Sequence, residues 1–348
     1  MKKSAPILVF CVLSACLTAL SSASVRFADA AAKIVSDPLR RLLASLSSPF
    51  PFPLFEVAVV LLPAVLLFAA IRGVRRGSDP SVYTRRAFSL AGILLSLTLL
   101  LAVLPARRAV PADPAPPSDG ELVSFADWLA ERANAEARFL PASDREGTPP
   151  AFPSTSACSR GVTALLCDAG LCPISPVRVK ATLFPGLLRR MGLLGYHASW
   201  TGEAVIDPRA PAYTVPFTAA HEAAHQAGIL SEGEASYIAY LSLLSSSDPA
   251  LRYAAVMGAL DAVLPLIKSG EQKRVVSTLS ECVRADLSLY DRLLASGKAA
   301  GTVAGANETA VRLRGGEDRR SYDLFPILAC RRYLARSAGD ADAAPAIY

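Results

Sequence analysis

Long apolar runs dominate the first third of the chain. Three of them carry almost no charge, and they cover residues 6–25, 52–71 and 87–106. Each run is close to the roughly 20 residues that an α-helix needs to cross the hydrocarbon core of a bilayer. The pattern therefore predicts a membrane region over residues 1–106 with three transmembrane helices.

The pattern changes after residue 106. Residues 107–120 are rich in proline and polar residues, which is typical of a semi-rigid linker. Apolar residues at helical spacing then predict helices over residues 121–140, 179–200 (interrupted near Pro185 and ended by Gly195), 250–264 and 275–294. The stretch "GEAVIDP" alternates as a short strand does.

These elements predict a mainly α fold. We expect three N-terminal transmembrane helices, then a helix-rich, zincin-like domain over residues 121–336 with a small β element, and a disordered tail over residues 337–348.

The first apolar run has two interpretations. Lysines precede it and small residues follow it, as in a cleavable secretion signal. Its charge-free length, however, exceeds the roughly 7–15 residues of a signal core, which favours an uncleaved anchor.

Positive charge predicts the orientation in the membrane. The short loop between the second and third runs holds five arginines: Arg72, Arg75, Arg76, Arg85 and Arg86. The positive-inside bias places this loop in the cytoplasm and the domain after residue 106 outside it. The loop also accounts for much of the net charge of +6, and no basic stretch interleaved with aromatic residues follows. We therefore expect a lipid bilayer as partner and no nucleic acid.

Five cysteines lie after the membrane region: Cys158, Cys167, Cys172, Cys282 and Cys330. In an oxidising compartment Cys158 can pair with Cys167 or Cys172. Buried free thiols are the alternative, and the spacing matches no cysteine-based zinc site.

The segment "HEAAH", residues 221–225, contains two of the three histidines of the chain. Thr218 is a candidate N-cap and Gly228 a candidate helix end. On such a helix His221 and His225 are about 40° apart around the axis and roughly 6 Å apart along it, so both imidazoles can bind one zinc ion. Glu222 can then take a proton from a water activated by the metal. This is the H-E-x-x-H arrangement of metallopeptidases.

A catalytic zinc ion normally has three protein ligands, so one more is needed. His197, Glu232 and Glu234 are the candidates. Ser231 and Glu234 have the spacing of a capping box, which favours Glu232 as the metal ligand. Ser236 lies one turn beyond Glu232, where it can support a ligating histidine.

Ordered motifs in this region resemble those of DUF3810, a bacterial membrane family called a domain of unknown function. They are "VKATLF", "GLLGY", "TGEA", "PFT", "HEAAHQAG" and "EGEASYIAYL", with "SPFPFPLFEV", "ELVSFADWLAERAN" and "RRSYDLF" elsewhere in the chain. The resemblance implies the membrane topology and a zinc site.

A wider resemblance is to the gluzincins. It implies that His221 and His225 are zinc ligands, that Glu222 is the base, and that Glu232, three residues before Ala235, is the third ligand. Ser236 stands where those families usually have Asp or Asn, and the gap between His225 and Glu232 is far shorter here. The two helices must therefore form a tight hairpin.

Together these features predict a membrane-anchored zinc metallopeptidase that hydrolyses a peptide or protein substrate outside the cytoplasmic membrane. The alternative is a zinc-stabilised membrane receptor or assembly factor without catalysis. We also expect "TGEA", residues 201–204, to form either an edge strand that pairs with a peptide or an ordinary core strand.

Overall fold

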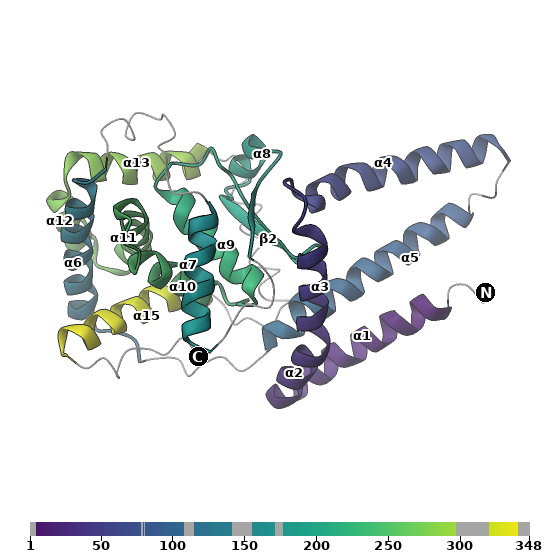
Figure 1. Cartoon of the computed structure of the whole chain (residues 1–348), viewed down its shortest axis with the longest axis horizontal. Coiled ribbons are helices and arrows are strands. Elements are labelled where there is room, and N and C mark those ends of the chain that lie inside the picture. Colours follow the sequence, from purple (N-terminus) through teal and green to yellow (C-terminus); the bar gives the residue numbers. More distant parts are fainter. Residues whose placement is uncertain are drawn as a thin grey trace. The chain divides into compact units, whose positions relative to one another are not determined.

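The structure is a computed structural model that describes residues 5–77, 79, 81–107, 115–140, 155–170, 177–296 and 320–339. Most of these residues are helical, and a three-stranded sheet is the small β element (Figure 1). The mainly α fold class is confirmed. Contacts divide the chain into two units, which are described separately. The first holds the described residues up to 107 together with the turn Ala198–Glu203, and the second holds the rest.

Apart from its turns and the strand residues Ala198 and Glu203, the described part of the first unit is helical. Its elements are α1 (Ala5–Ala23), α2 (Val25–Ala31), the π-helix η1 (Ala32–Ser36), α3 (Asp37–Ser47), α4 (Leu54–Arg75), α5 (Ser81–Thr98), the π-helix η2 (Leu99–Val103) and the 3₁₀-helix η3 (Pro105–Arg107). By length and composition, α4 and the continuous α5–η2 can cross a membrane, and α1 contains a shorter apolar segment. These three helices coincide with the three predicted apolar runs.

Helix α1 buries its small polar residues and exposes its large apolar ones. Ser14, Thr18 and Ser21 are buried, whereas Leu8 and Leu13 are exposed. The buried side packs against α5. In lipid the hydrophobic effect does not drive helices together, because the lipid tails are themselves apolar. Small residues instead let the helix backbones approach closely. The first apolar run thus packs against another apolar helix, and the uncleaved anchor stays a prediction.

The turn Ala198–Glu203 supplies the cap of α4. Both oxygens of Glu203 accept backbone hydrogen bonds, from the N–H groups of Leu54 (2.9 Å) and Phe55 (2.8 Å). The hydroxyl of Thr201 donates to the same carboxylate at 2.7 Å. A buried carboxylate thus satisfies two N–H groups that have no partner within the helix and interacts favourably with the helix dipole.

The second unit contains the sheet and the remaining helices. Its elements are α6 (Asp119–Ala137), α7 (Thr155–Asp168), β1 (Val179–Ala181), α8 (Pro185–Arg190), β2 (Gly195–Ala198), β3 (Glu203–Ile206), α9 (Thr214–Ala227), α10 (Glu232–Leu244), α11 (Pro249–Val263), the 3₁₀-helix η5 (Leu264–Leu266), α12 (Ser269–Thr278), α13 (Glu281–Ser296) and α15 (Arg320–Ser337). Helix α10 packs against α7, α9, α11 and α15 at the centre of the core.

Helix α11 is also long and apolar enough to cross a membrane. Its side chains lie inside the core of the second unit, where Tyr253, Met257 and Leu260 are fully buried. A polar contact within the same unit accompanies this packing, because the Tyr253 hydroxyl donates to Asp286 at 2.6 Å. We therefore interpret α11 as a core helix.

Several local predictions were wrong. Residues 179–200 form β1, α8 and β2 instead of an interrupted helix, because Val179 pairs with Ala204 across a parallel ladder that helical periodicity does not reveal. The predicted helix over residues 275–294 is broken between α12 and α13, where the Ser280 N–H donates to Asn134 Oδ1. Of the two alternatives for "TGEA", the edge strand is wrong and the core strand is confirmed, since β3 begins at Glu203, is buried and is the central strand in the order β1-β3-β2.

Four of the five cysteines after the membrane region lie among the described residues. Cys167 is disulfide-bonded, whereas Cys158, Cys282 and Cys330 are free, so the predicted pairing of Cys158 was wrong. Cys158 instead lies in the core, as the alternative interpretation expected. Cys172, residues 108–114 of the linker and residues 340–348 of the tail lie outside the described residues. Within the linker range, α6 already begins at Asp119.

Candidate metal centre

Helices α9 and α10 form the tight hairpin that the short gap requires. Helix α9 begins at Thr214, so Thr218 lies inside the helix and is not its N-cap. Gly228 ends α9 with a φ of +122°, which favours glycine, and the Ile229 N–H turns back to the carbonyl of Ala224. The Ser231 hydroxyl caps α10 by accepting a hydrogen bond from the N–H of Glu234. This is one of the two hydrogen bonds of the predicted capping box.

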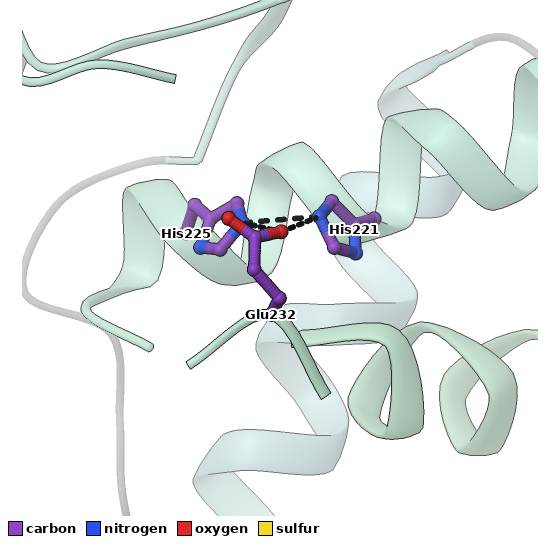
Figure 2. Close-up of side chains that lie close together, drawn as sticks. All are labelled: His221, His225 and Glu232. Atoms are coloured by element: carbon purple, nitrogen blue, oxygen red, sulfur yellow. Dashed lines mark hydrogen bonds and ion pairs between the residues drawn. The ribbon is translucent and has the colours of Figure 1, made fainter. Parts of the chain in front are cut away.

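Three donor atoms converge where the two helices face each other (Figure 2). His221 Nε2 lies 3.0 Å from His225 Nε2, and Glu232 Oε2 lies 3.2 Å from the first nitrogen and 3.4 Å from the second. Tetrahedral ligands at the bond lengths of zinc to nitrogen and oxygen are about 3.3 Å apart. The three donors therefore fit one zinc ion without rearrangement.

The far nitrogen of each imidazole is held by a second contact. His225 Nδ1 lies 2.7 Å from the carbonyl oxygen of Ile229. A carbonyl only accepts, so His225 carries a proton on Nδ1 and, when neutral, presents the lone pair of Nε2 to the cluster. His221 Nδ1 lies 3.1 Å from the hydroxyl of Ser236, which confirms the expected contact. Such contacts orient histidine ligands in metal sites.

The cluster is largely buried and attracts positive charge. Burial favours a higher pKa for Glu232, but His225 and His221 outweigh it and hold the pKa well below its usual range. Burial and the charge of His225 lower the pKa of His221, whereas the carboxylates outweigh burial and raise the pKa of His225 to about 9. The side chains of His221 and Glu232 are 17% and 21% exposed to solvent, so solvent can reach the cluster.

Glu222 is buried, and its Oε2 has no hydrogen-bond partner among the described residues. Burial raises the pKa of its carboxyl to about 8, although the charge of His225 opposes the shift. A buried carboxyl with a perturbed pKa beside three convergent donors is the combination expected of a functional site.

Strand β2 approaches Glu222 through Gly195. A Cβ on this glycine would lie 2.9 Å from Glu222 Cγ and 2.8 Å from both the Val205 carbonyl oxygen and Thr218 Cγ2. Any side chain here would therefore push strand and helix apart. Gly195 was expected only to end a helix, and its role depends on a contact that sequence spacing does not reveal.

The other candidate ligands lie outside the cluster. Among the described residues, the group that can share a cation consists of His221, His225 and Glu232. Glu234 sits in the first turn of α10 next to its cap. The ring centroid of His197, on β2, is 6.3 Å from that of His225. The structure thus brings together the three residues that the sequence favoured as ligands.

Comparison with known proteins gives one match. No curated protein and no solved structure matches the chain. The family described as "Protein of unknown function (DUF3810)" matches residues 33–310, which include all three donors of the cluster, the buried Glu222 and most of both units. Because the match covers far more than half of its length, the chain belongs to the DUF3810 family.

Proposed function

We propose that the chain is a membrane-anchored zinc metallopeptidase of the gluzincin type, with a zincin-like domain that hydrolyses peptide bonds outside the cytoplasmic membrane. The observation that carries the proposal is the convergence of His221, His225 and Glu232, with donor atoms 3.0–3.4 Å apart. Consecutive helices hold these donors in place, and the buried carboxyl of Glu222 is adjacent in sequence to the first of them.

The donor set suits catalytic zinc because it supplies two imidazoles and one carboxylate and leaves room for a fourth ligand. Zinc held there would act as a Lewis acid and lower the pKa of a water toward about 7. In its ionised form Glu222 takes a proton from the attacking water and later donates it to the leaving amine. Ser236 and the Ile229 carbonyl keep the imidazoles oriented throughout.

The membrane orientation is part of the proposal. Helices α1, α4 and α5 span the bilayer, and the segment that joins α4 to α5 carries arginine at both ends. The positive-inside bias places this segment in the cytoplasm and the metal centre on the opposite side.

The test uses the full-length chain purified in detergent. We expect about one zinc ion per wild-type chain by elemental analysis, and almost none in His225→Ala, because one of three ligands is lost. A peptide mixture analysed by mass spectrometry should be cleaved by the wild type. Glu222→Gln should keep its zinc and lose turnover, and Glu131→Gln, an exposed change on α6, should retain both.

Three results discriminate between the interpretations. A zinc-free wild type refutes the metal centre. Full turnover in Glu222→Gln refutes the assigned base. Stoichiometric zinc without cleavage of any peptide instead indicates the receptor or assembly factor, in which the metal joins α9 to α10.

A further inference from the structure

Helix α3 in the first unit has an inverted distribution of polar and apolar side chains. The residues Asp37, Arg40, Ala44 and Ser47 face inward, and Arg40 retains only 6% exposure. Large aliphatic side chains face outward, with Leu42 at 55% and Leu46 at 61%. A helix on a water-soluble surface shows the opposite arrangement. This distribution is unusual for a helix whose outward face contacts water.

The inward face packs on protein of the same unit. A Cβ on Gly202 would lie 2.7 Å from the backbone nitrogen of Ala44, so the turn Ala198–Glu203 touches α3 directly. The hydroxyl of Ser36, just before α3, donates to the carbonyl of Leu100 at 2.6 Å. The polar groups of this face thus lie against other segments of the unit, which leaves the aliphatic face pointing away from it.

The apolar face continues on both sides of α3. Ile34 in η1, one turn before α3, is 75% exposed. Phe50 and Phe52, between α3 and α4, are exposed and lie 5.8 Å apart by ring centroid. Lys33 and Arg41 are exposed along the same segment. Aliphatic and aromatic residues flanked by cations are typical of helices that lie in a membrane interface.

The charge and direction of α3 match that location. Helix α3 continues α2 and η1 without a break, and this continuous helix over residues 25–47 carries six charged residues. It is therefore not among the described helices that are apolar enough to cross a membrane. Within the first unit α3 runs crosswise to α1 and α4 (Figure 1). Exposed apolar side chains of those spanning helices, such as Leu13 and Val59, extend the same type of surface.

We propose that residues 33–52 form a lipid-binding element that lies in the bilayer interface. Ile34, Leu42 and Leu46 contact acyl chains, and Lys33 and Arg41 reach the phosphate headgroups. The proposal does not depend on the metal centre.

Fluorescence quenching tests the proposal in the full-length chain. The chain has two tryptophans, so Leu42→Trp and Ser124→Trp each add a third, the latter at an exposed position on α6. Both variants are reconstituted into vesicles of phosphatidylethanolamine with one quarter phosphatidylglycerol, with and without brominated acyl chains. The signal of the unsubstituted chain is subtracted.

We expect the indole at residue 42 to emit at short wavelength and to lose more than about half of its emission in brominated vesicles, because it contacts the acyl chains. The indole at residue 124 should emit at long wavelength and stay unquenched. Leu46→Trp repeats the test if Leu42→Trp does not fold. Long-wavelength, unquenched emission at both 42 and 46 would place the face in water, and short-wavelength, unquenched emission would mean that a second copy or another protein covers it. Either result overturns the proposal.

Discussion

Replacing Gly195 by alanine tests the packing that places Glu222. Three atoms surround the site of the added methyl group: the Val205 carbonyl oxygen and Thr218 Cγ2 at 2.8 Å, and Glu222 Cγ at 2.9 Å. Each distance falls about half an ångström short of ordinary contact, and the atoms belong to β3 and to α9. Two of the three cannot move away by rotation of a long flexible side chain. Strand β2, or the side chain of Glu222, must therefore shift.

The magnitude follows from this geometry. Overpacking of a well-packed site by one methyl group costs about 1–3 kcal/mol. For a unit of this size that loss lowers the unfolding temperature by roughly 2–12 °C. A displacement of 1 Å can cost about a hundredfold in turnover, so a shift half as large should lower kcat roughly tenfold. Zinc content should not change, since the three nearest atoms include none from the donor cluster.

Differential scanning calorimetry, elemental analysis and peptide hydrolysis on the full-length chain measure these effects. Gly270→Ala is the matched control, because a Cβ on Gly270 in α12 would have no neighbour within 4 Å. This change should be neutral or slightly stabilising, since alanine favours helix over glycine by about 1 kcal/mol. If Gly195→Ala unfolds at the temperature of the wild type and hydrolyses peptide at the same rate, β2 does not approach Glu222 as described.

Three further predictions concern separate parts of the chain. Ser236→Ala should weaken zinc binding at least about tenfold in a chelator competition assay, because the Ser236 hydroxyl orients a ligating histidine. Ser236→Asp should restore the affinity. Equal zinc affinity in the wild type and both variants would assign the hydroxyl no role. Glu203→Gln should destabilise the detergent-solubilised chain by about 1–3 kcal/mol in thermal unfolding, since an amide has one acceptor oxygen for two N–H groups. A loss of stability no larger than that of Glu131→Gln would contradict the capping of α4 by Glu203. Iodoacetamide at pH 8 should modify the partly exposed Cys282 well before Cys158, as measured by peptide mapping. Burial raises the pKa of the Cys158 thiol to about 12, which leaves about a thousandfold less thiolate than in an exposed cysteine. Alkylation of Cys158 should accelerate as the pH rises toward 12, and equal rates for the two thiols at pH 8 would contradict its burial.

Local signals were enough to predict that His221, His225 and Glu232 lie close together. His221, His225 and Glu232 lie within twelve residues, so helical periodicity and the capping pattern at Ser231 were enough to bring them together. Helix termini were less well predicted. Thr218 has the side chain of an N-cap, but tertiary packing extends α9 by a further turn and the hydroxyl bonds to a carbonyl inside the helix.

Features that depend on partners distant in the chain were not predicted. The parallel pairing of Val179 with Ala204 converts an apparent helix into strand, because β structure is stabilised by a partner that periodicity does not identify. The approach of Gly195 to Glu222 has the same origin, since it depends on where α9 lies beside the sheet.

The same distinction explains α3. Its residues alternate between polar and apolar at helical spacing whether the helix lies in water or in lipid, and only the direction of the buried face separates the two cases. That face became known once Gly202, more than 150 residues later in the chain, was found against Ala44. Residues 33–52 hold three cations, Lys33, Arg40 and Arg41, and charge alone favours an aqueous position for them, but Arg40 is buried and therefore does not mark an aqueous surface. Counting charges without their burial thus misassigns a segment whose polar side faces protein, and the lipid-facing assignment follows from the positions of Leu42 and Leu46.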